Sequence, residues 1–330
     1  MEEIGRKESQ SLVVSLSSVK QRIASLDLLR GLAIFLMVIV NSLFDYTAIP
    51  SWLKHAPWNG YTLSDLVAPM FLFSIGISYS LSFNKRMKTQ GALRTIFHFI
   101  LRYVILFCFG FFGEWVVLGK IGWGVLTMIG AVGIYSLAFM FLKPLPRVVL
   151  SVIPFITYEI LVYFRVPIVL FVDGGLGGPA ATVAWGFIVI AASSTGNWIH
   201  DKAQKTVTGV LGIQGAVLTA LGIGLSFLLP FNKHLVSASY IVFSTGVSAL
   251  MMLLFYFLAD IWKWKIPVLP VIGRNALVIY ILSNLLILGL NAVIPLDASL
   301  LWVIFGTAAV TGICIGVGFF LDWRKWYIRL

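Results

Sequence analysis

A histidine and an aspartate that stand ten residues apart are the side chains of this sequence best suited to acid–base chemistry. His55 lies in the stretch Asp45–Ser64, which also contains two prolines, two tryptophans, an asparagine and a glycine. Imidazole is the group in this stretch that ordinarily titrates near neutrality, so His55 is a candidate general base. Asp65 follows at the start of an apolar run. It either caps the helix that begins there or accepts the second ring N–H of His55 and orients the ring.

Asn41 lies shortly before this stretch, near the outer end of the apolar run that comes before it. An amide inside a membrane commonly hydrogen-bonds to a neighbouring helix. The proximity of Asn41 to the His55 stretch also makes it a candidate for the reaction itself. Asn41, His55 and Asp65 therefore form the candidate catalytic set.

Basic residues at the other end of the same run could bind phosphate. Arg22 and Arg30 flank its start, and the planar guanidinium group matches phosphate oxygens. Asp27 lies three residues before Arg30, on the same helical face. The competing interpretation is a charge-balanced helix start that Ser25 caps.

Further polar groups lie in or beside later apolar runs. Arg274 and Asn275 lie at the expected start of a helix, where they could bind an anion or simply flank the membrane. Glu159 falls inside an apolar run, where a carboxylate needs a partner. Arg165 and Arg102 are the nearest candidates for that partner.

The elements that position these residues must be membrane-spanning helices. Of the 330 residues, 59% are hydrophobic and 11% charged, with a mean hydropathy of +0.97. Soluble domains are about 25% charged, and a helix needs about 20 apolar residues to cross a bilayer. The alternating pattern of a membrane β-barrel does not occur. We therefore predict an all-α, polytopic transmembrane bundle of about ten spans: 26–44, 65–83, 96–113, 123–142, 148–164, 179–194, 207–229, 236–258, 271–290 and 300–321.

We interpret the net charge of +11 as a signal of how the protein is oriented in the membrane, and not of an affinity for nucleic acid. Most of the 24 Lys and Arg residues lie in the two tails and in alternate connections between spans. Cytoplasmic loops are the ones rich in Lys and Arg, so we expect both termini in the cytoplasm. The exceptions are Lys54, Arg102, Lys120, Arg165 and Lys233.

This orientation defines three regions. We expect a cytoplasmic tail over 1–25, the bundle over 26–322 and a second cytoplasmic tail over 323–330. The first of these has no apolar core or cleavage site typical of a signal peptide. Cys108 and Cys314 lie in apolar runs and offer no metal-binding spacing, so we expect no metal.

Four segments of the sequence resemble the heparan-α-glucosaminide N-acetyltransferase family. They are 22–31 with Asn41, 55–76 with its His-Ala-Pro-Trp-Asn-Gly-Tyr-Thr opening, 233–240, and 273–280 with its Gly-Arg-Asn opening. The first two segments are specific, and the later two are weaker. Members of the family are multispan enzymes that use acetyl-CoA.

The resemblance implies a transfer across the membrane. Acetyl-CoA would enter from the cytoplasm and its acetyl group would reach an amino sugar or related glycan acceptor on the opposite face. The active-site histidine of the family falls on His55 and its catalytic asparagine on Asn41. Asn41 would then donate N–H groups to the oxyanion, while His55 would act as base or carry the acetyl group itself.

The resemblance also indicates where the co-substrate binds and where the protein resides. Arg22, Asp27, Arg30, Arg274 and Asn275 would form the cytoplasmic site for acetyl-CoA. We expect a protein of a prokaryotic cell membrane, surrounded by membrane lipid, with a homodimer as the candidate assembly. The main alternative is a multispan transporter of a small anion or lipid-linked sugar.

Overall fold

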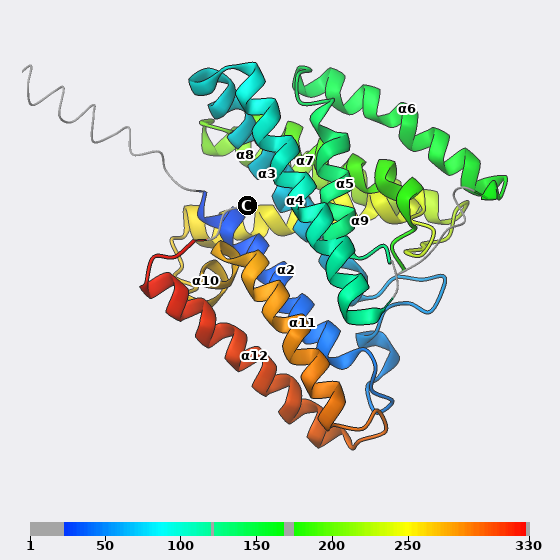
Figure 1. Ribbon diagram of the computed structural model, residues 1–330. Helices are drawn as coiled ribbons and strands as arrows, with labels where there is room; N and C mark the ends of the chain where they lie inside the picture. Colours follow the sequence, from blue (N-terminus) through cyan, green and yellow to red (C-terminus); the bar gives the residue numbers. More distant parts are fainter. Residues whose placement is uncertain (1–22, 120–121, 168–174, 328–330) are drawn as a thin grey trace, which may run out of the picture.

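The computed structural model describes residues 23–119, 122–167 and 175–327, and these residues are helical or irregular, without strands (Figure 1). Their helices are α2 (Ala24–Leu43), α3 (Leu63–Gln90), α4 (Ala92–Leu118), α5 (Val125–Leu137), α6 (Pro144–Tyr163), α7 (Thr182–Ile199), α8 (Gln204–Ser226), α9 (Ala238–Phe255), α10 (Val268–Arg274), α11 (Ala276–Val293) and α12 (Leu300–Trp323). Short 3₁₀ turns occur at η1 (Ser51–Leu53) and η4 (Pro179–Ala181), and a π-helical turn, η5 (Tyr256–Ile261), extends α9.

The predicted polytopic bundle is confirmed, with two local differences. Among the described residues, nine helices are long and apolar enough to cross a membrane. The predicted span 123–142 holds a shorter apolar helix, α5, of 13 residues. The predicted span 271–290 is interrupted, because the backbone leaves helical geometry at Asn275 and separates α10 from α11.

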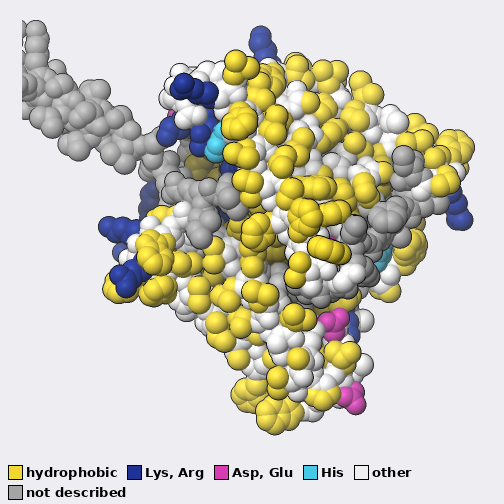
Figure 2. Space-filling model, in the orientation of Figure 1, with side chains coloured by type: hydrophobic (Ala, Val, Ile, Leu, Met, Phe, Trp, Pro, Cys, Tyr) yellow, Lys and Arg dark blue, Asp and Glu magenta, His cyan; other side chains and the backbone are white. Residues whose placement is uncertain are grey.

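Three helices form the interior of the bundle and the others surround them. The most apolar stretches of α2 and α3 are each 67% buried and that of α7 is 78% buried, against 22% for α4, α6, α8 and α12. The peripheral helices therefore present their apolar side chains to lipid. Figure 2 shows this apolar surface, with most of the visible Lys and Arg side chains near the described start of the chain. The central helices α2 and α3 carry Asn41 and Asp65, and the connection between them carries His55.

The two ends of the described chain lie close together. Figure 1 places the last residues after α12 beside the start of α2, and Tyr327 lines the same cavity as Arg30. The first and last described residues therefore lie at the same end of the bundle.

The N-terminus of α2 is capped by a residue from a distant segment. The Asp260 carboxylate accepts hydrogen bonds from the backbone N–H groups of Ala24 and Ser25, at 3.2 and 3.0 Å. The prediction that Ser25 caps this helix is wrong: Ser25 lies inside the helix, and its hydroxyl has no hydrogen-bond partner among the described residues. A carboxylate at this end is also favoured by the helix dipole.

The partner predicted for Glu159 is likewise wrong. Its carboxylate accepts a hydrogen bond from the backbone N–H of Ala238, at 2.8 Å, in the first turn of α9. Glu159 thus satisfies one of the N–H groups that a helix start leaves without an intrahelical acceptor.

Glycines allow α2 and α10 to pack backbone to backbone. A Cβ atom added at Gly31 would lie 1.9 Å from the carbonyl oxygen of Leu269, and one added at Gly273 would lie 2.5 Å from that of Asp27. Small residues allow such close approach in membrane bundles, where van der Waals packing drives helix association. The contact holds Arg274 beside the start of α2.

We predict that Gly31→Ala destabilises the protein. The added methyl group must push α10 away from α2, which is expected to lower the free energy of unfolding by about 1–3 kcal/mol. Thermal unfolding in one detergent would measure the effect. Gly113→Ala is the matched control, because a Cβ at Gly113 meets nothing within 4 Å. Equal stabilities of the two variants would contradict the packing argument.

Candidate functional site

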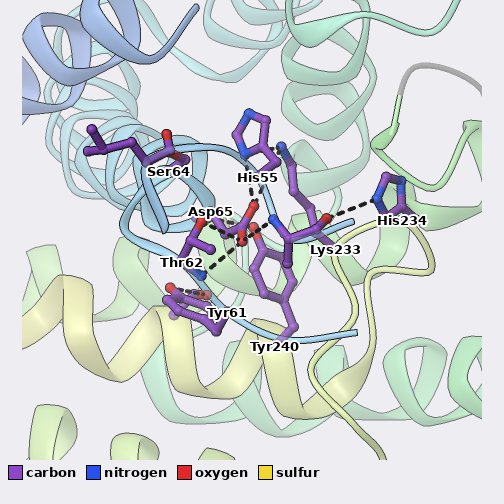
Figure 3. Close-up of polar contacts among 11 residues, drawn as sticks. His55, Tyr61, Thr62, Ser64, Asp65, Lys233, His234 and Tyr240 are labelled. Atoms are coloured by element: carbon purple, nitrogen blue, oxygen red, sulfur yellow. Dashed lines mark hydrogen bonds and ion pairs between the residues drawn. The ribbon is translucent and has the colours of Figure 1, made fainter. Parts of the chain in front are cut away.

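A buried carboxylate holds the candidate histidine in place. The Nδ1 atom of His55 lies 2.8 Å from Oδ1 of Asp65, whose side chain is fully buried (Figure 3). Because a carboxylate only accepts hydrogen bonds, this short contact favours the tautomer with the proton on Nδ1. The other ring nitrogen, Nε2, is then left with a lone pair. This is the tautomer that a general base requires.

The same carboxylate also begins α3. Its Oδ2 atom accepts hydrogen bonds from the backbone N–H and the hydroxyl of Thr62, both at 3.0 Å, and from the backbone N–H of Ala56 at 3.3 Å. Thr62 and Asp65 form a capping box. Both roles that the sequence left open for Asp65 are therefore present at once, one on each carboxylate oxygen.

A lysine from the segment between α8 and α9 completes the cluster. Lys233 Nζ lies 3.1 Å from Nδ1 of His55 and 3.9 Å from Oδ1 of Asp65 (Figure 3). Its side chain is only 12% exposed. Lys233 was not among the predicted site residues. The sequence does carry a signal for it, since Lys233 is one of the few basic residues in an expected outer loop.

Burial and charge set the protonation of this cluster. Burial is the largest influence on the pKa of His55 and lowers it, the hydrogen bond to Asp65 raises it, and the charge of Lys233 lowers it. Burial also lowers the pKa of Lys233 to about 8, against the attraction of Asp65. At neutral pH, therefore, His55 is mostly neutral and Lys233 is mostly charged.

Two loops pack together to position these side chains. The imidazole of His234 stacks on the indole of Trp58, with ring centroids 5.3 Å apart. Asn232 donates a hydrogen bond to the side chain of Asn59 at 3.0 Å. The loop between α2 and α3 is thus attached to the segment that carries Lys233, which is far away in the sequence.

Asn41 lies in the last turn of α2. Phe44 follows it by one helical turn, and the Phe44 ring contacts the His55 ring at a centroid distance of 5.5 Å. Because residues three apart share a helical face, we expect Asn41 on the His55 side of α2, one turn deeper.

A cavity of about 460 Å³ lies between α2, α3, α4, α5, α10 and α11, toward the other end of α2. The guanidinium groups of Arg30, Arg102 and Arg274 line it, together with apolar and tyrosine side chains. Arg30 donates a hydrogen bond to the Ser78 hydroxyl, and Arg274 is paired with Asp322 at 2.6 Å. The Nε atoms of Arg102 and Arg274 are buried without a hydrogen-bond acceptor among the described residues. The three lining arginines offer donors suited to an anion.

The structure brings together most of the residues predicted to bind the co-substrate. Arg30 and Arg274 line one cavity, and Asp27 lies 3.9 Å from Arg30. Asn275 is fully buried next to Arg274 and does not line the cavity. Arg22 lies outside the described residues. Arg102, which the sequence analysis placed only as a candidate partner of Glu159, is an additional lining residue.

The lining of the cavity ends short of the histidine cluster and does not include Asn41, His55 or Asp65. Its lining includes Met37, one turn before Asn41, and Phe71, six residues after Asp65. At 1.5 Å per residue, Arg30 and Asn41 are about 16 Å apart along α2. The described residues contain no group of three His, Cys, Asp or Glu side chains that could hold a metal ion.

Fold and site together define a polytopic helical membrane protein with a cationic cavity at one end and a His–Asp–Lys cluster at the other. A domain family of unknown function, DUF5009, matches residues 22–142, the segment that contains α2, α3 and His55. This match covers the candidate catalytic set but not Lys233 or Arg274.

Two curated proteins are similar to part of the chain. Human heparan-alpha-glucosaminide N-acetyltransferase is 34% identical over 144 residues, which are 40% of this chain and 21% of the human protein. The mouse protein of the same name is 34% identical over 141 residues, 39% of this chain and 21% of its own. The matched region thus spans about a fifth of the length of these relatives. The resemblance predicted from the sequence is confirmed over this region, and the chain is an integral multi-pass membrane protein.

We predict that Asp65→Asn destabilises the protein strongly. The amide cannot accept the four hydrogen bonds of the buried carboxylate in the same way, and loss of such charge-assisted bonds is expected to cost about 1.5–3 kcal/mol. Asp45→Asn is the control, because Asp45 is exposed and accepts one hydrogen bond, from Asn291. Thermal unfolding in detergent would compare them, and a control that loses as much stability as Asp65→Asn would argue against the central role of this carboxylate.

Proposed function

We propose that this protein is a membrane-embedded acetyltransferase. It would move the acetyl group of cytoplasmic acetyl-CoA to the amino group of an amino sugar or related glycan on the extracytoplasmic side of a prokaryotic cell membrane. The observation that carries the proposal is the position of an oriented, neutral imidazole at one end of α2 and of a cavity lined by three arginines toward the other. The names of the two relatives support the reaction class.

His55 is the proposed general base. It takes the proton that the amino nitrogen loses as this nitrogen bonds to the acetyl carbon, and it returns a proton to the sulfur as the carbon–sulfur bond breaks. Asp65 keeps Nδ1 protonated, so that Nε2 faces the reaction with its lone pair. Asn41 would donate its amide N–H to the oxygen that becomes negative in the transition state.

The arginine cavity is the proposed site for the phosphates of acetyl-CoA. The three arginines that line the cavity fit an anionic ligand, because guanidinium groups form charge-assisted hydrogen bonds with phosphate oxygens. An extended pantetheine arm running along α2 would bring the thioester from this cavity toward Asn41 and His55. Acetyl-CoA supplies the activated acetyl group, and the protein supplies the orientation and the proton acceptor.

Acetylation of His55 before transfer is a second route that this geometry allows. Incubation with labelled acetyl-CoA in the absence of acceptor separates the two routes. The covalent route releases free CoA and leaves label on the protein, whereas direct transfer does neither.

We predict that His55→Gln abolishes transfer without loss of acetyl-CoA binding. Removal of a general base lowers kcat by about 10²- to 10⁴-fold. The assay would measure labelled acetyl transfer to a panel of glucosamine-containing acceptors, with calorimetry for binding. His200→Gln is the control, because His200 is paired with the exposed Asp201 at the end of α7. Unchanged turnover in His55→Gln would remove the proposed base.

We predict that Arg102→Gln weakens the binding of acetyl-CoA. Loss of one charge-assisted phosphate contact is expected to raise Kd by about 10- to 100-fold. Arg86→Gln is the matched control, because Arg86 hydrogen-bonds to Gln90 on the exposed surface of α3. Equal Kd values for the two variants would place the co-substrate elsewhere. A wild-type protein that acetyl-CoA does not stabilise against heat would favour the transporter alternative.

A further inference from the structure

The protonation state of His55 depends on Lys233, a residue that has no role in the proposed reaction steps. Lys233 Nζ lies 3.1 Å from Nδ1 of His55, on the side of the ring that also faces Asp65. With a neutral imidazole, the charges of Lys233 and Asp65 cancel. With a protonated imidazole, the cluster carries one unbalanced positive charge away from bulk water, which is costly.

We propose that Lys233 is a positioning residue that keeps His55 neutral by placing a positive charge beside the ring, while the hydrogen bond to Asp65 holds the remaining ring proton on Nδ1. This inference rests on the proposed function, for which it names a residue outside the candidate catalytic set. It assigns a purpose to a buried lysine in a loop expected on the outer side of the membrane.

The other groups around the imidazole do not provide this charge. From α2 the ring meets Phe44, which carries no charge. The Tyr61 hydroxyl is bonded to Ser244, and the Tyr240 hydroxyl donates to the backbone carbonyl of Asp65. His234 lowers the pKa of His55 by its charge, but this is the smallest of the influences on that pKa. Lys233 is therefore the cation that directly contacts the ring among the described residues.

The direction of the effect follows from the charges. Lys233 opposes a second proton on His55, whereas Asp65 favours it, so loss of Lys233 alone leaves Asp65 to raise the pKa of His55. A larger fraction of the imidazole would then be protonated at a given pH below neutrality. Since a protonated Nε2 cannot accept the amine proton, the acid limb of the pH–rate profile would move to higher pH.

The test measures the titration of His55 itself, which does not depend on any assay of activity. Isotope-labelled histidine in the full-length protein in detergent gives imidazole NMR signals, and the His55 signal is the one missing from His55→Gln. In Lys233→Met we expect the midpoint of this titration to rise by about one pH unit. In Lys233→Arg, which keeps the charge, we expect it to stay near the wild-type value.

A neighbouring lysine supplies the matched control. Lys54 precedes His55 in the same loop, and Lys54→Met is expected to leave the midpoint unchanged. If Lys233→Met does not fold, Lys233→Gln removes the charge while retaining hydrogen bonding and serves in its place. An unchanged His55 midpoint in the folded neutral variant would overturn the proposal.

Activity measurements separate this inference from the proposed function. With an active wild-type enzyme, the acid limb of kcat/KM should move in Lys233→Met by the same amount as the NMR midpoint, and a limb that stays in place would contradict the positioning role. If the wild-type protein transfers no acetyl group while the NMR midpoint still shifts, the proposed function fails but the electrostatic role of Lys233 holds.

Discussion

The Asp65 carboxylate is the constraint on which the rest of the site depends. A fully buried charge is tolerated only when it is well hydrogen-bonded, and this one receives bonds from the turn before α3 on one oxygen and from His55 on the other. Helix capping and imidazole orientation are therefore one structural feature. If the imidazole ring turned away, Oδ1 of the buried Asp65 carboxylate would lose its hydrogen bond from His55.

The central position of α2 connects this cluster to the other end of the protein. A helix buried among α3, α10 and α11 cannot shift easily, so the spacing of about 16 Å between Arg30 and Asn41 is fixed. The glycine contact with α10 places Arg274 beside Arg30 at one end, and Phe44 contacts His55 at the other. Anion binding and proton transfer are thereby positioned by the same helix.

The sequence predicted the helical bundle well and the site in part. Apolar runs report helices directly, because each span must be apolar along its length. His55 and Asp65 were recognisable since they lie close in the sequence. Lys233, by contrast, is 178 residues from His55. Its signal was its position as a basic residue in an expected outer loop, and Arg102 stood out similarly as a basic residue inside a span.

By itself, the sequence determined the order and approximate position of the apolar helices and a resemblance that names His55 and Asn41. Only the tertiary structure decided the partners of the buried charges. Asp260 caps α2, the backbone of Ala238 satisfies Glu159, and Lys233 accompanies His55. The reason is physical: hydropathy is a property of each segment alone, whereas a buried charge is satisfied by whichever segment the packing of helices brings to it.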